Sequence, residues 1–170
     1  MRAKRVWPVI MLLCVGIGLM TTGCRTKGTV AENEELLPTD VLAGDYPLAS
    51  WDKPGELVTG LHWQNVLFEY DSAQIDRGER SKIEDVGRYM KEHSRYRVLL
   101  EGNCDERGSR EYNMALGERR ALAVRAYLIG LGMDGENILT KSFGEEKPLD
   151  QGHSEDAWRA NRRVEFVVYR

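Results

Sequence analysis

The sequence has little of what many catalytic and metal-binding sites are built from. It contains three cysteines and three histidines among 170 residues. The histidines, His62, His93 and His153, are far apart and lack the close spacing that is typical of metal ligands. No glycine-rich phosphate-binding loop is present either. The sequence therefore predicts neither a metal site nor another cofactor.

The chain also lacks an excess of positive charge. Its 24 lysines and arginines are outnumbered by 27 aspartates and glutamates, which gives a formal net charge of −3. Proteins that bind nucleic acids neutralise phosphates with a basic surface, and this composition does not supply one. We therefore expect no nucleic-acid partner.

No apolar run is long enough to favour crossing a bilayer. The run from Val9 to Met20 is shorter than the stretch of about 20 residues that a membrane-spanning helix needs, and basic residues precede it. Small residues then lead directly to Cys24, which resembles a bacterial lipobox, although Thr21 stands where leucine is usual. We expect residues 1–23 to be a lipoprotein signal peptide and Cys24 to carry lipid. An ordinary signal peptide or an uncleaved anchor is the alternative.

Removal of such a signal changes the charge and the cysteine count. Three basic residues and no acidic ones are lost, so the formal net charge falls from −3 to −6. Cys14 leaves with the signal and Cys24 is lipidated, so Cys104 is left without a disulfide partner. The residue directly after Cys24 is Arg25, whereas an aspartate at this position signals retention in the inner membrane. We therefore expect the protein to be located in the outer membrane and to face the periplasm.

The remainder of the chain divides into a tether and one folded domain. Residues 24–57 have no sustained helical or strand periodicity and contain scattered prolines and glycines, as expected of a flexible tether. Residues 58–170 show clear periodicity. The expected strands are 66–70, 96–101, 137–143 and 163–169, and the expected helices are 76–93, 109–130 and 155–160. This order predicts a two-layer α/β sandwich of βαβαββ type, with a mixed sheet and the helices on one face.

One charged residue falls on the apolar face of the helix predicted over 109–130. With 3.6 residues per turn, Leu116, Val124 and Tyr127 share a face, and Arg120 lies near its middle. A guanidinium cannot be neutralised by deprotonation, and burying it without an acceptor is costly. We therefore expect Arg120 to have a partner.

Four motifs in this order resemble the OmpA C-terminal-like peptidoglycan-binding domain family, over about residues 64–170. They are "VLFEYDSAQI" (66–75), "EGNCDERGSREYNMALGERRA" (101–121), "FGEEKP" (143–148) and "NRRVEFVV" (161–168). The "DERG" form of the loop, together with the lipobox, is similar to the peptidoglycan-associated lipoproteins within this family.

The resemblance implies a non-covalent binding protein for the meso-diaminopimelate residue of peptidoglycan stem peptides. The binding residues that it implies are Asp105, Arg120, Asn113, Phe68, Glu69, Asp71 and Arg162. It also implies a tether between outer membrane and cell wall that acts in a Tol-Pal-type system of envelope integrity and cell division, with a periplasmic Tol protein as partner. Two positions depart from the family pattern, with Asn103 in place of histidine and Cys104 in place of threonine or alanine.

The chemistry of the residues agrees with this interpretation. Diaminopimelate presents a carboxylate and an ammonium on one carbon, so its site needs a cation and an anion side by side. Arg120 can hold a carboxylate with its planar fork, and Asp105 can accept from the ammonium. We expect Asp105 also to be part of the acceptor for Arg120. The alternative is an envelope protein-interaction module in which the Asp105/Arg120 pair is purely structural.

The sequence does not predict an enzyme. Cys104 and His153 lack a local nucleophile signature. Nothing places a second acid opposite Asp105 across a sugar-binding cleft, as a glycosidase requires.

Of the neighbouring Arg162 and Arg163, we expect one to brace a carboxylate and the other to be exposed.

Overall fold

A computed structural model describes residues 55–170 of the chain. The predicted signal peptide 1–23, the lipidation site Cys24 and nearly all of the tether 24–57 lie outside the described residues. In the described part, no helix has both the length and the apolar character needed to cross a membrane.

The described residues form four strands, three α-helices and a short 3₁₀ helix. In chain order these are β1 (Val66–Leu67), α1 (Arg77–Glu92), β2 (Arg97–Asn103), α2 (Arg110–Gly130), η2 (Gly135–Asn137), β3 (Ile138–Gly144), α3 (Glu155–Asn161) and β4 (Arg163–Tyr169). The predicted order of elements is confirmed.

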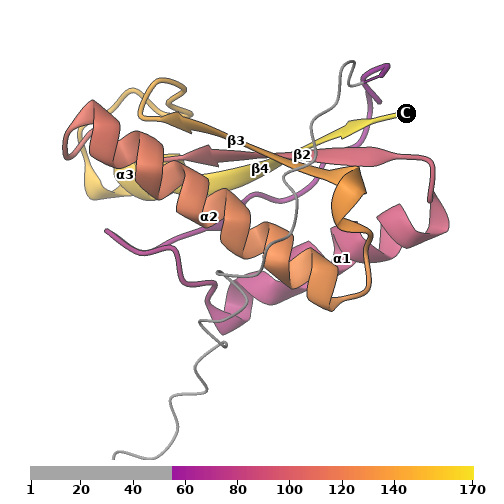
Figure 1. Ribbon diagram of the computed structural model, residues 1–170. Helices are drawn as coiled ribbons and strands as arrows, with labels where there is room; N and C mark the ends of the chain where they lie inside the picture. The colour runs from indigo at the N-terminus through magenta and orange to yellow at the C-terminus, as the bar shows by residue number, and fades with distance from the viewer. Residues whose placement is uncertain (1–54) are drawn as a thin grey trace, which may run out of the picture. The chain divides into compact units, whose positions relative to one another are not determined.

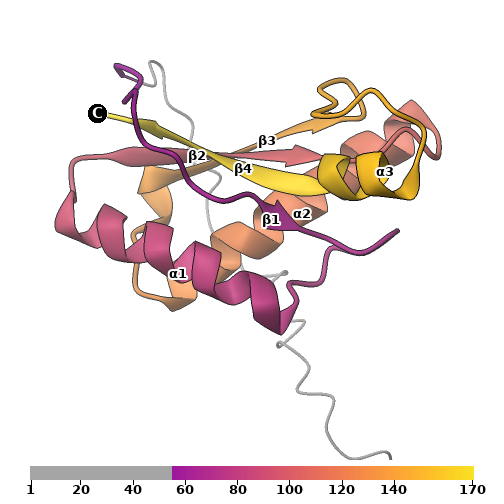
Figure 2. The same cartoon turned by 180° about the vertical axis from the view of Figure 1, so that it is seen from behind.

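The strands make one mixed sheet in the order β1-β4-β2-β3. Strand β4 is antiparallel to both β1 and β2, whereas β2 and β3 are parallel and are joined through α2. Figures 1 and 2 show α1 and α2 on the same side of the sheet, and α3 at the end where β4 begins. This is the predicted two-layer sandwich.

The core lies between the sheet and the two long helices. Helix α1 buries Ile83, Val86, Gly87 and Met90, which are the positions that its apolar periodicity selects. Helix α2 buries Leu116, Ala121, Val124 and Leu128, together with three polar residues, Asn113, Arg120 and Arg125. Arg120 has no exposed surface, so the prediction of an inward-facing arginine is confirmed.

Two strand boundaries differ from those predicted. Strand β1 ends at Leu67 rather than at residue 70, because the chain turns over residues 69–72 and Asp71 adopts a positive φ of 53°. Strand β2 continues to Asn103 rather than ending at residue 101. Gly102 still pairs with Ser142 of β3 and Val164 of β4, and the register with β3 shifts between Gly102 and Asn103.

The contact between Gly102 and Gly117 sets the distance between α2 and the sheet. A Cβ atom placed on Gly102 would lie 1.9 Å from the Gly117 carbonyl oxygen, which is far inside van der Waals contact. Glycine at both positions therefore allows the backbones of β2 and α2 to touch. Since Asn113 and Arg120 flank Gly117 on the buried face of α2, this contact brings both side chains to the end of β2.

Candidate functional site

A small pocket lies where three segments meet at the carboxyl end of β2. The segments are the turn that follows β1, the loop between β2 and α2, and the first turns of α2. The pocket has an interior of about 90 Å³. Its lining residues are Tyr70, Asp71, Cys104, Asp105, Arg107, Gly108, Tyr112, Asn113, Leu116, Arg120 and Arg162.

Arg120 is held at the pocket by neutral acceptors. Its Nε donates to the carbonyl oxygen of Ser72 at 2.8 Å, Nη1 to that of Asn103 at 2.9 Å, and Nη2 to that of Glu69 at 3.1 Å. Nη1 also contacts the Cys104 sulfur at 3.4 Å. Burial lowers the pKa of Arg120 from its ordinary value, but a guanidinium keeps its proton in proteins. A positive charge is therefore buried beside the pocket.

The expectation that Asp105 accepts a hydrogen bond from Arg120 is wrong. Asp105 is paired instead with Arg107, whose Nη2 lies 2.7 Å from Oδ2, and with Arg162, whose Nη1 lies 3.2 Å from the same oxygen. The Arg107 backbone N–H donates to Oδ1 at 3.1 Å. The reason is geometric, since three carbonyl oxygens, two from the turn after β1 and one from the end of β2, already surround the Arg120 guanidinium.

Asp105 is almost fully buried, and its partners keep it ionised. Burial is the largest single influence on the pKa of Asp105 and by itself would raise it. The hydrogen bonds from Arg107 and Arg162 together outweigh burial, so the pKa of Asp105 lies below its ordinary value. The carboxylate is thus negatively charged at neutral pH.

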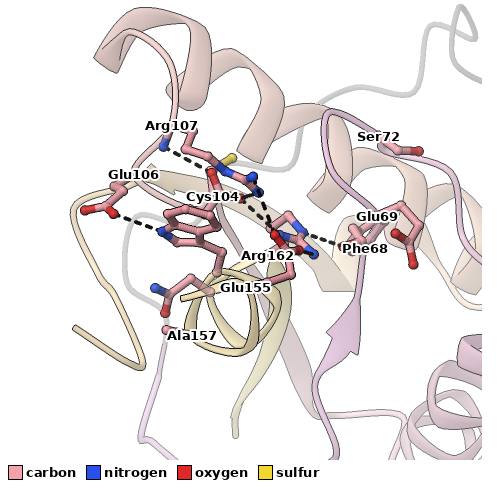
Figure 3. Close-up of polar contacts among 12 residues, drawn as sticks. Phe68, Glu69, Ser72, Cys104, Glu106, Arg107, Glu155, Ala157 and Arg162 are labelled. Atoms are coloured by element: carbon pink, nitrogen blue, oxygen red, sulfur yellow. Dashed lines mark hydrogen bonds and ion pairs between the residues drawn. The ribbon is translucent and has the colours of Figure 1, made fainter. Parts of the chain in front are cut away.

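Arg162 and Arg163 are both buried, so the expectation that one of them is exposed is wrong. Arg162 donates to Asp105, to the Phe68 carbonyl oxygen at 3.0 Å and to Glu155 at 2.9 Å. Figure 3 shows Arg162 between Phe68 and Glu155, with Arg107 beside it. Arg163 points elsewhere and pairs with Glu165.

Asn113 lies on the first turn of α2, whose start is fixed by Ser109. The Ser109 hydroxyl accepts a hydrogen bond from the Tyr112 N–H at 3.2 Å, so Ser109 is the N-cap of the helix. The Asn113 amide then donates to the Asp105 carbonyl oxygen at 3.3 Å and to Glu145 Oε2 at 2.5 Å. Asn113 thus holds the backbone of the loop that carries Asp105.

The three predicted residues that follow β1 take different positions. Asp71 lines the pocket, and its carboxylate accepts a hydrogen bond from the Tyr112 hydroxyl. The Phe68 ring is buried, and the Arg120 Cζ lies 5.3 Å from its centroid. Glu69 contributes only its carbonyl oxygen to Arg120, and its side chain is exposed. The structure therefore brings Asp71, Asp105, Asn113, Arg120 and Arg162 together around one pocket.

Comparison with known proteins gives the same assignment as the motifs. A model described as "OmpA family" matches residues 67–162, which is more than half of the chain. The chain belongs to the OmpA family. The match covers β2, α2 and β3 and ends at Arg162, so it includes all the residues that line the pocket.

Three curated relatives of this OmpA-family chain are named peptidoglycan-associated lipoproteins. The one from Pseudomonas aeruginosa is 49% identical over 99 residues, which is 58% of this chain and 58% of that protein. The one from Legionella pneumophila is 42% identical over 117 residues, or 68% and 66% of the two chains. The one from Brucella melitensis is 31% identical over 155 residues, or 89% and 87%. The chain thus matches little more than half the length of the Pseudomonas relative.

Solved structures agree with this family assignment. The crystal structure of the peptidoglycan-associated lipoprotein from Burkholderia pseudomallei matches with a TM-score of 0.60 and 39% identity, covering 61% of this chain and 88% of that one. The C-terminal domain of Helicobacter pylori MotB also matches with a TM-score of 0.60, covering 64% and 86%. Its identity is 22%, so it supports the fold alone.

Sequence reasoning missed two features of this OmpA-family pocket. Arg107, which lies in the "DERG" loop, stacks with its Cζ 4.2 Å from the ring centroids of both Tyr70 and Trp158. The position of Arg107 in the quoted motif was a usable signal. Trp158 lies on α3, 51 residues further along the chain, and no local pattern links it to the loop.

The side chains considered for catalysis are engaged elsewhere. The Cys104 thiol donates to the Asn113 carbonyl oxygen at 3.3 Å, while His153 Nδ1 lies 2.7 Å from Glu106. Burial raises the pKa of Cys104, which keeps it in the thiol form. Within residues 55–170, no three or more histidine, cysteine or acidic side chains are grouped to hold a metal ion.

Proposed function

We propose that the chain binds peptidoglycan without covalent chemistry, by holding the zwitterionic end of meso-diaminopimelate in the stem peptide. The observation that carries the proposal is the Arg120 guanidinium, which is fully buried beside a pocket and hydrogen-bonded to carbonyl oxygens. No carboxylate of residues 55–170 forms an ion pair with it. A buried charge favours an opposite charge nearby, and a ligand carboxylate supplies one.

Asp105 is the acceptor for the ligand ammonium in this proposal. A carboxylate has about four lone-pair sites, and three donors from Arg107 and Arg162 already use Asp105. One site remains for an ammonium. Asn113 fixes the loop that presents Asp105, while Asp71 adds a second negative group at the rim.

The size of the pocket fits the end of an amino acid. A cavity needs about 10 to 15 Å³ of interior space to hold one water molecule, so an interior of about 90 Å³ has room for several. This room suffices for an amino group and a carboxylate on one carbon. In this proposal the peptide is the part that is bound.

The proposal includes the remainder of the chain. Lipid on Cys24 holds the protein in the outer membrane, and residues 24–57 let the domain reach the cell wall from the periplasmic side. The names of the three curated relatives described above, each a peptidoglycan-associated lipoprotein, support this arrangement. A Tol-type periplasmic protein is the expected protein partner.

One observation favours the second candidate, an envelope protein-interaction module in which Asp105 and Arg120 are structural. The Arg120 guanidinium ties the turn after β1 to the end of β2 through Ser72, Glu69 and Asn103. Such a brace would be retained even without a ligand. The two candidates differ in whether conservative changes abolish binding while the fold is kept.

Titration calorimetry of the full-length protein in detergent separates them. The ligands are the peptide L-Ala-γ-D-Glu-meso-diaminopimelate-D-Ala and its counterpart with lysine in place of diaminopimelate. We expect the first to bind, and the lysine peptide to bind about 30-fold more weakly or worse, because it lacks the carboxylate that Arg120 attracts.

Two variants and their matched controls complete the test. Asp105→Asn and Arg120→Lys are expected to lose binding while their circular dichroism spectra stay native. Asp85→Asn and Arg88→Lys alter an exposed aspartate–arginine pair on α1 and are expected to bind normally. Failure of the unmodified protein to bind the diaminopimelate peptide would leave the protein-interaction module as the function.

A further inference from the structure

Arg107 has the most unused hydrogen-bonding capacity among the arginines that line the pocket. A guanidinium carries five N–H groups, and Arg107 uses one of them, at Nη2, for Asp105. Its Nε is buried and has no partner within residues 55–170. Its Nη1 lies 3.6 Å from Glu155, beyond hydrogen-bond distance.

Aromatic stacking holds this guanidinium in place. The Cζ of Arg107 lies 4.2 Å from the ring centroids of Tyr70 and Trp158, which come from the turn after β1 and from α3. Cation–π contacts of this kind orient the planar group before any ligand arrives. Ordering the arginine therefore costs little when it binds an acceptor.

The charges around the pocket exceed what a zwitterion can balance. Three arginines and two aspartates line it, so the lining carries one more positive than negative charge. The end of diaminopimelate has one charge of each sign and leaves this excess unchanged. Glu155 contacts Arg107 and Arg162 from outside, but it is 62% exposed and water screens most of its charge.

The position of Arg107 is suited to a neighbouring part of the ligand. The proposed function places the end of one amino acid in the pocket, so the rest of the peptide lies along the rim. Arg107 is at that rim, with 29% of its side chain exposed, whereas Arg120 is fully buried. The two arginines can therefore meet different groups of one ligand.

We propose that Arg107 binds a second carboxylate of the ligand, on the residue next to diaminopimelate. In a stem peptide this is the free α-carboxylate of D-glutamate, which is linked through its side-chain carboxyl group. The inference rests on the proposed function and deepens it. It predicts that the protein distinguishes peptidoglycan with free D-glutamate from peptidoglycan in which this group is amidated.

The test compares two peptides on the unmodified full-length protein in detergent, by titration calorimetry. One is L-Ala-γ-D-Glu-meso-diaminopimelate-D-Ala, and the other carries D-isoglutamine, so that the α-carboxylate is an amide. We expect the amidated peptide to bind about tenfold more weakly, as the loss of one exposed ion pair with good geometry implies. No variant is needed for this comparison, so it does not depend on whether a variant folds.

Substitutions then assign the difference to Arg107. Arg107→Gln is expected to weaken binding of the glutamate peptide about tenfold and to make the two peptides bind equally. Arg110→Gln is the matched control, because Arg110 is exposed, pairs with Glu146 and lies outside the pocket lining. It is expected to keep the tenfold preference.

Four results would overturn the inference. Equal affinity of the unmodified protein for both peptides shows that the second carboxylate is not recognised. An Arg107→Gln protein that keeps the preference assigns recognition to another residue, and one that binds both peptides more tightly shows that Arg107 competes with the ligand for Asp105. Absence of binding to either peptide overturns the proposed function as well, and is thereby distinguished from failure of the inference alone.

Discussion

The Arg162 guanidinium donates to the Asp105 carboxylate at 3.2 Å, and only 4% of each side chain is exposed. Arg162 immediately precedes β4, and Asp105 follows β2, so this buried pair joins the ends of two neighbouring strands. Arg162 also binds the carbonyl oxygen of Phe68 after β1. The acid proposed to receive the ligand ammonium is therefore itself part of the framework of the site.

The first prediction is that Asp105→Ala destabilises the fold by about 3 kcal/mol, because it leaves Arg162 buried without its buried partner. Urea denaturation at neutral pH measures this cost. Asp85→Ala removes one member of the exposed Asp85–Arg88 pair and is expected to change the free energy of unfolding by about 0.5 kcal/mol or less. Equal effects of the two substitutions would contradict a structural role for the Asp105–Arg162 pair.

A second prediction concerns acid stability. The pKa of Asp105 is lower in the folded protein than its ordinary value of 3.8, so its contribution to stability is fully present above about pH 4 and is lost as the pH falls further. We expect the stability difference between the parent and Asp105→Asn to shrink as urea denaturation is repeated from pH 5 to pH 3. A difference that stays constant over this range would show that the ionised form of Asp105 is not preferentially stabilised by folding.

Local pattern was sufficient to predict most of the fold. The buried positions of α1, the Ser109 cap of α2 and the bounds of β4 each depend on neighbours within a few residues in the sequence. Helical periodicity also placed Arg120 inside the protein. These properties can be read from the chain because helix caps, apolar repeats and strand alternation are local.

The partners within the site could not be predicted in the same way. The acceptors of Arg120 are backbone carbonyl oxygens 17 to 51 residues away, and side-chain identity carries no signal for a carbonyl oxygen. Asp105 and Arg120 looked like a pair because their charges are opposite. Instead, the turn at residues 69–72, with its positive φ at Asp71, places the carbonyl oxygens of Glu69 and Ser72 at the Arg120 guanidinium.

A third prediction tests the start of α2. Ser109→Ala removes the hydroxyl that accepts from the Tyr112 N–H, and we expect a loss of about 1 kcal/mol in the free energy of unfolding. Ser81→Ala is the control, since Ser81 is an exposed residue inside α1 and alanine is favourable there. The variants are compared by urea denaturation. A Ser109→Ala protein as stable as Ser81→Ala would show that the cap does not stabilise the helix that carries Asn113 and Arg120.

The last prediction concerns the glycine contact that places α2 on the sheet. In Gly102→Ala the new methyl group would lie 1.9 Å from the Gly117 carbonyl oxygen, so α2 has to move away from β2. Overpacking of this kind costs about 1 to 3 kcal/mol, and we expect a loss in that range in urea denaturation. Gly78→Ala is the matched control, because nothing lies within 4 Å of a Cβ atom there and alanine favours the α1 helix, so stability is expected to rise slightly.

Gly102→Ala is also expected to weaken binding of the diaminopimelate peptide without altering any lining side chain. The reason is that the movement of α2 displaces Arg120 and Asn113 from the carbonyl oxygens of Asn103 and Asp105. A Gly102→Ala protein with parental stability and affinity would mean that the spacing between α2 and β2 does not control the geometry of the pocket.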